Sequence, residues 1–96
     1  MPLFAFIGHD GPRGATLRKQ HRPAHLKGLE DLADAGRIVH AGPLLDEGGA
    51  PIGSLVVFEA DDLAAAREIA ARDPYVVEGI FARHSVNETR AVFARS

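Results

Sequence analysis

The chain has 96 residues, with 11 basic and 13 acidic side chains, five histidines and no cysteine. This is the length of one domain, residues 1–96, and the lack of cysteine excludes disulfide bonds and thiolate metal sites. Charges of both signs are interspersed without a basic stripe, so we expect no nucleic-acid partner. The apolar runs are too short to cross a bilayer and no signal-peptide pattern is evident, which predicts a cytoplasmic protein without a membrane segment.

The first third of the chain predicts a strand and a helix. Residues 3–7 form an apolar run, typical of a strand buried on both faces, and the Gly/Asp/Pro cluster that follows, with His9 and Asp10, predicts a loop. Apolar residues then recur with helical spacing between residues 15 and 35. Pro23 lies inside this span, so either the helix kinks or a new helix begins near Arg22.

The rest of the chain predicts one more helix and several strands. The extended segments are residues 37–41, 52–59, 79–86 and a short terminal 91–93. The Gly42-Pro43 pair and the loop that follows predict a turn-rich connection, which makes the first two of these segments a hairpin. The second helix begins after Asp61 or Asp62, which can cap it, and ends before Pro74.

The predicted order, β-α-β-β-α-β, is that of the ferredoxin-like α+β fold. Both helices would cover one face of an antiparallel sheet. The opposite face carries several apolar side chains and would stay exposed in a monomer, which is typical of an interface. We therefore expect a symmetric homodimer that packs two sheets face to face.

One histidine and one aspartate stand out because each lies beside a proline at an element boundary. His25 follows Pro23 at the end of an apolar helical stripe, and Asp73 directly precedes Pro74. If they meet, the carboxylate would orient the ring and hold one nitrogen protonated, as in an acid/base pair. Alternatively, His25 is a packed core residue and Asp73 a local turn residue. Arg22, a solvated residue by default, could bind a carboxylate or phenolate ligand.

Other chemical signals are weak. His21 and His25 have the i, i+4 spacing of a helical metal pair, but Arg22 replaces the expected glutamate and a proline intervenes, so we expect no metal. Four histidines receive no role: His9, His21, His40 and His84. The sequence contains no nucleophile motif and no glycine-rich phosphate loop. The residues alone therefore predict a small α+β domain with a candidate His/Asp site.

Six short motifs follow one another along nearly the whole chain. They are residues 22–26 (RPAHL), 36–37 (GR), 41–43 (AGP), 53–54 (GS), 71–75 (ARDPY, followed by Gly79) and 84–86 (HSV). In this order they resemble the YciI-like (YCII-related) family. The resemblance implies a dimeric α/β barrel of ferredoxin-like subunits, and it implies that His25 and Asp73 correspond to the histidine and aspartate that the family places in a pocket as a catalytic pair.

Two hypotheses follow for the function. In the first, the protein is an enzyme without a cofactor, in which His25 and Asp73 act as an acid/base pair on a small cyclic or phenolic substrate, with Arg22, Ser54 and Tyr75 as ligand contacts. A lyase of the dehydrochlorinase kind is the reaction that the resemblance implies. In the second, the same pocket binds a metabolite without catalysis and the pair is structural.

Overall fold

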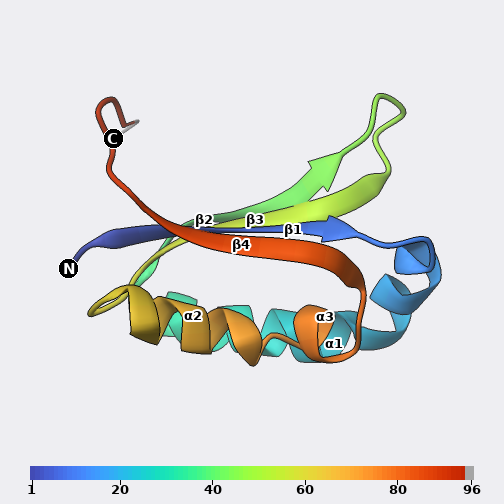
Figure 1. Ribbon diagram of the computed structural model, residues 1–96, viewed down its shortest axis with the longest axis horizontal. Helices are drawn as coiled ribbons and strands as arrows, with labels where there is room; N and C mark the ends of the chain where they lie inside the picture. Colours follow the sequence, from blue (N-terminus) through green and yellow to red (C-terminus); the bar gives the residue numbers. More distant parts are fainter. Residues whose placement is uncertain (95–96) are drawn as a thin grey trace.

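The computed structural model describes residues 1–94 and contains seven elements (Figure 1). They are β1 (Leu3–Asp10), α1 (Gly14–Asp34), β2 (Ile38–Leu45), β3 (Pro51–Glu59), α2 (Leu63–Ala71), α3 (Pro74–Val77) and β4 (Phe81–Thr89). The predicted order is therefore correct, with the one-turn helix α3 added between α2 and β4.

The strands form one antiparallel sheet in the order β2-β3-β1-β4. The three helices lie together on one face of this sheet, and the hairpin of β2 and β3 rises away from them at one end (Figure 1). This arrangement confirms the ferredoxin-like α+β fold. The pairing of two such subunits stays a prediction at this point.

The core lies between the sheet and the helices. Phe4 and Phe6 of β1 and Val56 and Phe58 of β3 alternate along their strands and are buried against the helical layer. The intervening side chains on β1 are only half-buried. The expectation that β1 is buried on both faces is therefore wrong, because a sheet with helices on one side leaves its other face without cover.

Helix α1 runs unbroken over 21 residues with Pro23 inside it, so no new helix begins at Arg22. Gly36 follows its C-terminus with a φ of 72°, a left-handed conformation that glycine adopts without strain. The backbone N–H groups of Gly36 and Arg37 donate to carbonyls of Ala33 and Leu32 in the last turn. The helix thus ends at this glycine, next to residue 35, where the helical spacing of the sequence also ends.

Several predicted boundaries are wrong. His9 and Asp10 belong to β1, because both pair with neighbouring strands where a loop was expected. Gly42 and Pro43 lie inside β2 and not in a turn, and the proline is tolerated because β2 is an edge strand of the sheet. Residues 91–93 form no strand, since β4 ends at Thr89.

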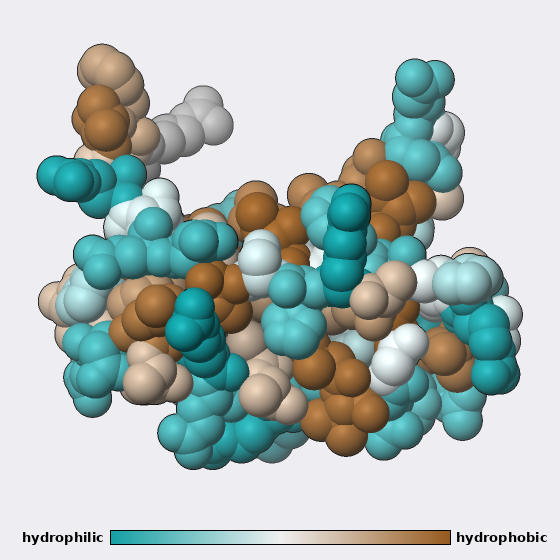
Figure 2. Space-filling view, viewed as in Figure 1, coloured by the Kyte–Doolittle hydropathy of each residue, from teal (hydrophilic) through white to brown (hydrophobic). Residues whose placement is uncertain are grey.

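The face of the sheet away from the helices carries half-buried apolar side chains. Leu3, Ala5 and Ile7 of β1 and Leu55 and Val57 of β3 belong to it, on the side opposite to the buried phenylalanines. Hydrophobic atoms are visible along this side of the molecule, between the hairpin and the C-terminal segment (Figure 2). Within residues 1–94, no helix is long and apolar enough to span a membrane.

Candidate active site

A cavity of about 500 Å³ lies between α1 and the hairpin of β2 and β3. Apolar side chains form much of its wall: Leu26, Leu29, Pro43, Pro51 and Val56. Its polar side chains are Arg18, Lys19, Arg22, His25, Ser54 and Tyr75. Among the described residues that line it, none is a carboxylate. A mostly apolar cavity of this size with a few polar groups is typical of a small-molecule site.

The structure brings His25 and Asp73 together. His25 Nδ1 lies 2.9 Å from Oδ1 and 3.0 Å from Oδ2 of Asp73, and the two side chains are only 8% and 9% exposed. An ionised carboxylate can only accept hydrogen bonds, so Nδ1 must carry the hydrogen and donate it. The contact therefore fixes both the orientation of the ring and its tautomer.

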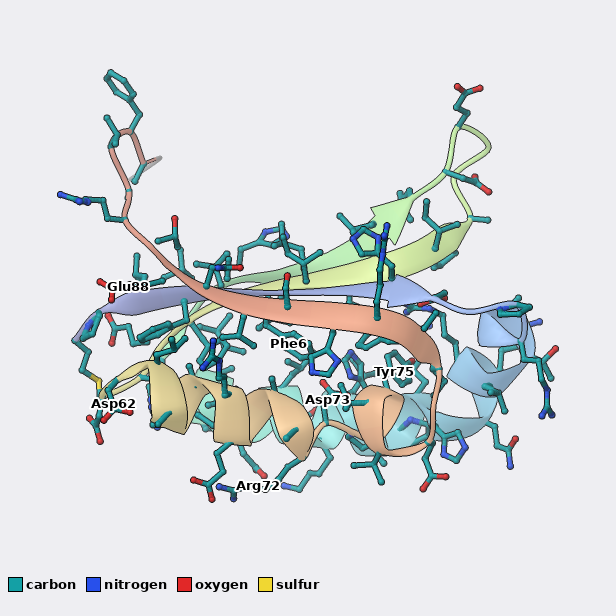
Figure 3. All side chains as sticks on the ribbon, in the orientation of Figure 1. Phe6, Asp62, Arg72, Asp73, Tyr75 and Glu88 are labelled. Atoms are coloured by element: carbon teal, nitrogen blue, oxygen red, sulfur yellow. The ribbon has the colours of Figure 1, made fainter. Side chains whose placement is uncertain are left out.

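Asp73 is placed by the start of helix α3. Its side chain is the N-cap, accepting the backbone N–H of Tyr75 at 2.8 Å, and Pro74 occupies the first helical position. Asp73 and Tyr75 lie between the helical layer and the sheet, whereas the neighbouring Arg72 points away from the sheet (Figure 3). The Asp-Pro pair, which stops α2, thereby also directs the carboxylate inward.

Tyr75 packs directly against the histidine. The two rings are stacked with centroids 3.9 Å apart and an angle of 7° between their planes. The Tyr75 hydroxyl donates to the backbone carbonyl of Arg18 at 3.2 Å. Burial raises the pKa of Tyr75, and the nearby Arg18 and Arg22 lower it only in part. Tyr75 thus presents its ring to the cavity, while its hydroxyl is engaged by the backbone of α1.

His25 Nε2 remains available to a ligand. Within residues 1–94, no residue forms a hydrogen bond to it, whereas every fully buried polar side-chain atom there has a partner. Nε2 is therefore not sealed off, and the ring that carries it lines the cavity. Asp73 therefore holds Nδ1, while Nε2 is free to contact a ligand in the cavity. Proton transfer by a histidine requires this geometry.

A second polar cluster in the cavity was missed by the sequence analysis. Arg18 Nε and Nη2 donate to Asp10 at 2.6 and 2.9 Å, and Nη2 also donates to Ser54 Oγ at 3.0 Å. Asp10 fits against the start of α1 because a Cβ at Gly14 would come within 2.6 Å of its carboxylate. The guanidinium also lies 4.9 Å from the centre of the Tyr75 ring.

A sequence signal for this cluster exists. Arg18, Arg22 and His25 recur at four- and three-residue spacing, so they share one face of a helix. Asp10 ends a strand next to that helix. The predicted loop at Asp10 concealed the signal, because a loop aspartate usually bonds to its own backbone.

The other predicted residues are distributed unevenly around the cavity. Ser54 is buried at its wall and bonded to Arg18, while Arg22 lies at the exposed rim beside Lys19. The histidines without a predicted role do not line the cavity: His9, His21, His40 and His84. In the described part of the chain, no three histidine, aspartate or glutamate side chains converge as metal ligands would.

Comparisons with known proteins agree with this architecture. The model of the YCII-related domain family matches residues 2–90. The chain is 37% identical to protein YciI of Escherichia coli, over 95% of this chain and 99% of that protein. It is 32% identical to an uncharacterized protein of Haemophilus influenzae, over 94% and 98% of the two chains.

A solved structure is similar as well. It is 5-chloro-2-hydroxyhydroquinone dehydrochlorinase (TftG) from Burkholderia phenoliruptrix AC1100, in complex with 2,5-dihydroxybenzoquinone. The two structures superpose with a TM-score of 0.83 at 28% identity, covering 92% of this chain and 93% of the other. From the family match and the relatives together, the chain belongs to the YCII-related domain family.

Proposed function

We propose that the protein is an enzyme in which His25 transfers a proton to or from a small cyclic, oxygenated substrate. The observation that carries this proposal is the state of the imidazole: Nδ1 is held by Asp73 and Nε2 is left without a partner in a ring that lines the cavity. A histidine buried only for packing would be expected to have both ring nitrogens satisfied by the protein.

Asp73 would support both directions of proton transfer. When Nε2 takes a proton, the ring becomes cationic and its contact with the carboxylate becomes an ion pair in a site with little solvent. When Nε2 gives the proton back, the same contact restores the tautomer with hydrogen on Nδ1. A positioned general acid/base of this kind contributes about 10²–10⁴-fold to a rate.

The substrate class follows from the cavity and from one relative. Its apolar walls suit a flat ring, and its cationic and hydroxyl groups suit ring oxygens; Arg22, Ser54 and Tyr75 would contact the ligand. TftG, which is named for a dehydrochlorinase activity, was solved with a dihydroxybenzoquinone bound. Elimination of a proton together with a leaving group from a phenolic ring is the reaction that we propose for this chain.

The test is to measure turnover of 5-chloro-2-hydroxyhydroquinone through the release of chloride. The wild type should release chloride, and His25→Gln should lower the rate by roughly 10²–10⁴-fold while keeping the fold. His21→Gln, on the same helix but away from the cavity, is the matched control and should keep the wild-type rate. Full activity in a folded His25→Gln protein would contradict the proposal.

A second candidate function is ligand binding without catalysis. It is favoured by the other role of Asp73, which caps α3 whatever the histidine does. In that case the pair is structural, and the wild type binds 2,5-dihydroxybenzoquinone while releasing no chloride from the chlorinated substrate. The same assay therefore separates the two functions.

We propose further that the chain is a homodimer that packs the outward faces of two sheets together. The half-buried apolar side chains of β1 and β3 on that face support this, because they would otherwise remain without cover. The helices and the cavity lie on the opposite face and stay accessible in such a pair. A monomer in sedimentation equilibrium at micromolar concentration would contradict it. A cytoplasmic location likewise stays a prediction.

A further inference from the structure

We propose that the free edge of strand β4, together with a groove between β4 and helix α2, binds an extended acidic segment of another protein. The segment would add to the four-stranded sheet as a further strand. The groove shares no residue with the cavity that His25 lines. The two sites are therefore separate, and binding at the edge of β4 does not depend on the proposed function.

The two edges of the sheet differ in how well they can accept another strand. β2 contains Pro43 and its pairing with β3 shifts register twice, and both features disfavour the addition of a strand. β4 contains no proline, and its residues from Arg83 to Thr89 pair with β1 in unbroken register. Within residues 1–94, no strand pairs with the outer side of β4. β4 therefore presents a row of unpaired backbone N–H and carbonyl groups to a partner.

A groove of about 490 Å³ lies beside this edge. In Figure 1, β4 is the strand nearest the viewer and α2 lies below it. Residues of both elements line the groove: Arg67, Ala71, His84, Ser85, Val86 and Asn87. A strand added to β4 would direct every second side chain toward this groove. The edge would then supply backbone hydrogen bonds for affinity, and the groove would select the side chains.

The α2 side of the groove is suited to an acidic side chain. Arg67 is exposed there, and no described residue forms an ion pair with it. Arg72 of the same region differs, because it bonds Glu68 at 2.9 Å and points away from the sheet (Figure 3). No residue that lines the groove is a carboxylate. An acidic side chain placed in it would therefore meet an unpaired guanidinium and no like charge.

The charges along β4 favour the same kind of partner. Arg83 and Arg90 lie near the two ends of the strand and outnumber its one carboxylate, Glu88, although the whole chain carries a net charge of −2. Residues 84–87, in the middle of the strand, include no lysine, arginine or carboxylate that would hinder pairing. The edge is thus locally positive on a protein that is negative as a whole, which selects acidic segments.

His84 is the second polar side chain on the helix side of this edge. Its ring contacts the ring of Phe6 edge to face, with centroids 5.8 Å apart and an angle of 78° between the planes. Phe6 lies between β4 and the helical layer (Figure 3), so the contact holds His84 on the side of α2. An imidazole always carries at least one N–H group and can donate it to a carboxylate. His84 would thus contribute a donor to the same groove.

The opposite side of the edge determines the other half of the expected pattern. Ser85, Asn87 and Thr89 alternate with the residues of the helix side, so their side chains lie on the outward face of the sheet. The remaining side chains of an added strand would lie beside these polar groups. The expected segment therefore alternates acidic residues with small polar residues that favour strands, such as threonine.

The experiment uses three short peptides with blocked ends. In the first, glutamate alternates with threonine; in the second, glutamine replaces each glutamate; the third is the first with a proline in its middle, which removes a ladder hydrogen bond. In ¹⁵N–¹H NMR titrations, the glutamate peptide should shift the amide signals of residues 83–89 and of α2, and leave those of β2 unchanged. The glutamine peptide should bind roughly 3- to 10-fold more weakly. The proline peptide should bind at least about 10-fold more weakly.

Two variants on the helical layer separate the groove from general charge. Arg67→Gln should remove the preference for the glutamate peptide over the glutamine peptide. Arg72→Gln removes an equal charge nearby, from a side chain that points away from the sheet, and should keep the preference. Both positions are exposed, so both variants should fold, and the amide spectrum recorded before each titration verifies this.

Several results would overturn the proposal. These are an absence of shifts at millimolar peptide, shifts confined to β2, equal binding of the glutamate and glutamine peptides, and loss of the preference in Arg72→Gln as well as in Arg67→Gln. Signals of residues 83–89 that change with protein concentration alone, together with oligomers larger than a dimer, would show that a second copy of the chain occupies this edge. That result would also overturn the proposal.

Discussion

The cavity contains two cationic or basic side chains of helix α1 that are each held by one carboxylate, and the two pairs are built differently. Asp10 accepts hydrogen bonds from Arg18 with both carboxylate oxygens, and this partner is rigid and permanently charged. Asp73 holds His25, whose charge changes with proton transfer, and also caps a helix. Tyr75 contacts both of the held side chains.

The pairs differ in whether the basic side chain can change its charge. Arg18 stays charged, because a guanidinium does not lose its proton in a protein. The His25 pair leaves Nε2, a nitrogen that can take and return a proton. Removing the carboxylate of Asp10 should therefore affect mainly stability, because it leaves the charge of Arg18 uncompensated. Removing the carboxylate of Asp73 should affect mainly the tautomer of His25 and its proton transfer.

The largest expected effect on stability is at the Arg18 pair. Arg18→Gln leaves the Asp10 carboxylate with little solvent and no cation, and breaking such a pair costs about 3–5 kcal/mol. Urea denaturation should show this decrease in the free energy of unfolding, and Asp10→Asn/Arg18→Gln should recover much of it. His25→Gln should cost less, because Asp73 keeps its bond from the Tyr75 N–H.

An equal loss of stability in Arg18→Gln and His25→Gln would remove this contrast. Failure of the double variant to recover stability would show that the loss does not come from an uncompensated charge.

A smaller effect is expected at alkaline pH, from the tyrosine between the pairs. Tyr75 is the single tyrosine of the chain, and burial raises its pKa above the ordinary value of 10.0. The unfolded chain then loses the phenol proton before the folded one does, so stability is fully present below about pH 10 and falls as pH rises through the folded-state pKa. Tyrosine absorbance, recorded with circular dichroism, measures this.

The matched control is Tyr75→Phe, whose stability should fall less steeply over the same pH range. Ionisation of Tyr75 near pH 10 in a protein that keeps its native circular dichroism would contradict the buried, bonded hydroxyl.

The two pairs also show how much of the site could be predicted from the sequence. His25 and Asp73 drew attention because each has a proline nearby; Asp73-Pro74 does mark an element boundary, whereas Pro23 lies inside α1. The β-α-β-β-α-β order followed from short-range patterns in the same way. The contact of Arg18 with Asp10 was missed despite the helical spacing of Arg18, because it depends on β1 continuing through Asp10, and the pairing of Asp10 with Phe81 of β4 determines that.

Similar limits apply to the wrong boundaries. Pro43 was expected in a turn, but an edge strand has one side without partners and can accept a proline there. Helix α3 was missed because a single turn has no periodicity to detect, although its cap and its N1 proline were both visible as Asp73 and Pro74.

The most direct test of the account is the tautomer of His25, observed by ¹⁵N–¹H correlation NMR of the neutral imidazole, with His25→Gln used to assign its signals. We expect a protonated Nδ1 and an unprotonated Nε2 in the wild type, and a shift of hydrogen toward Nε2 in Asp73→Ala, which lacks the acceptor. A wild-type ring with its hydrogen on Nε2 would show that Asp73 does not hold the histidine, and the acid/base role proposed for the pair would fall.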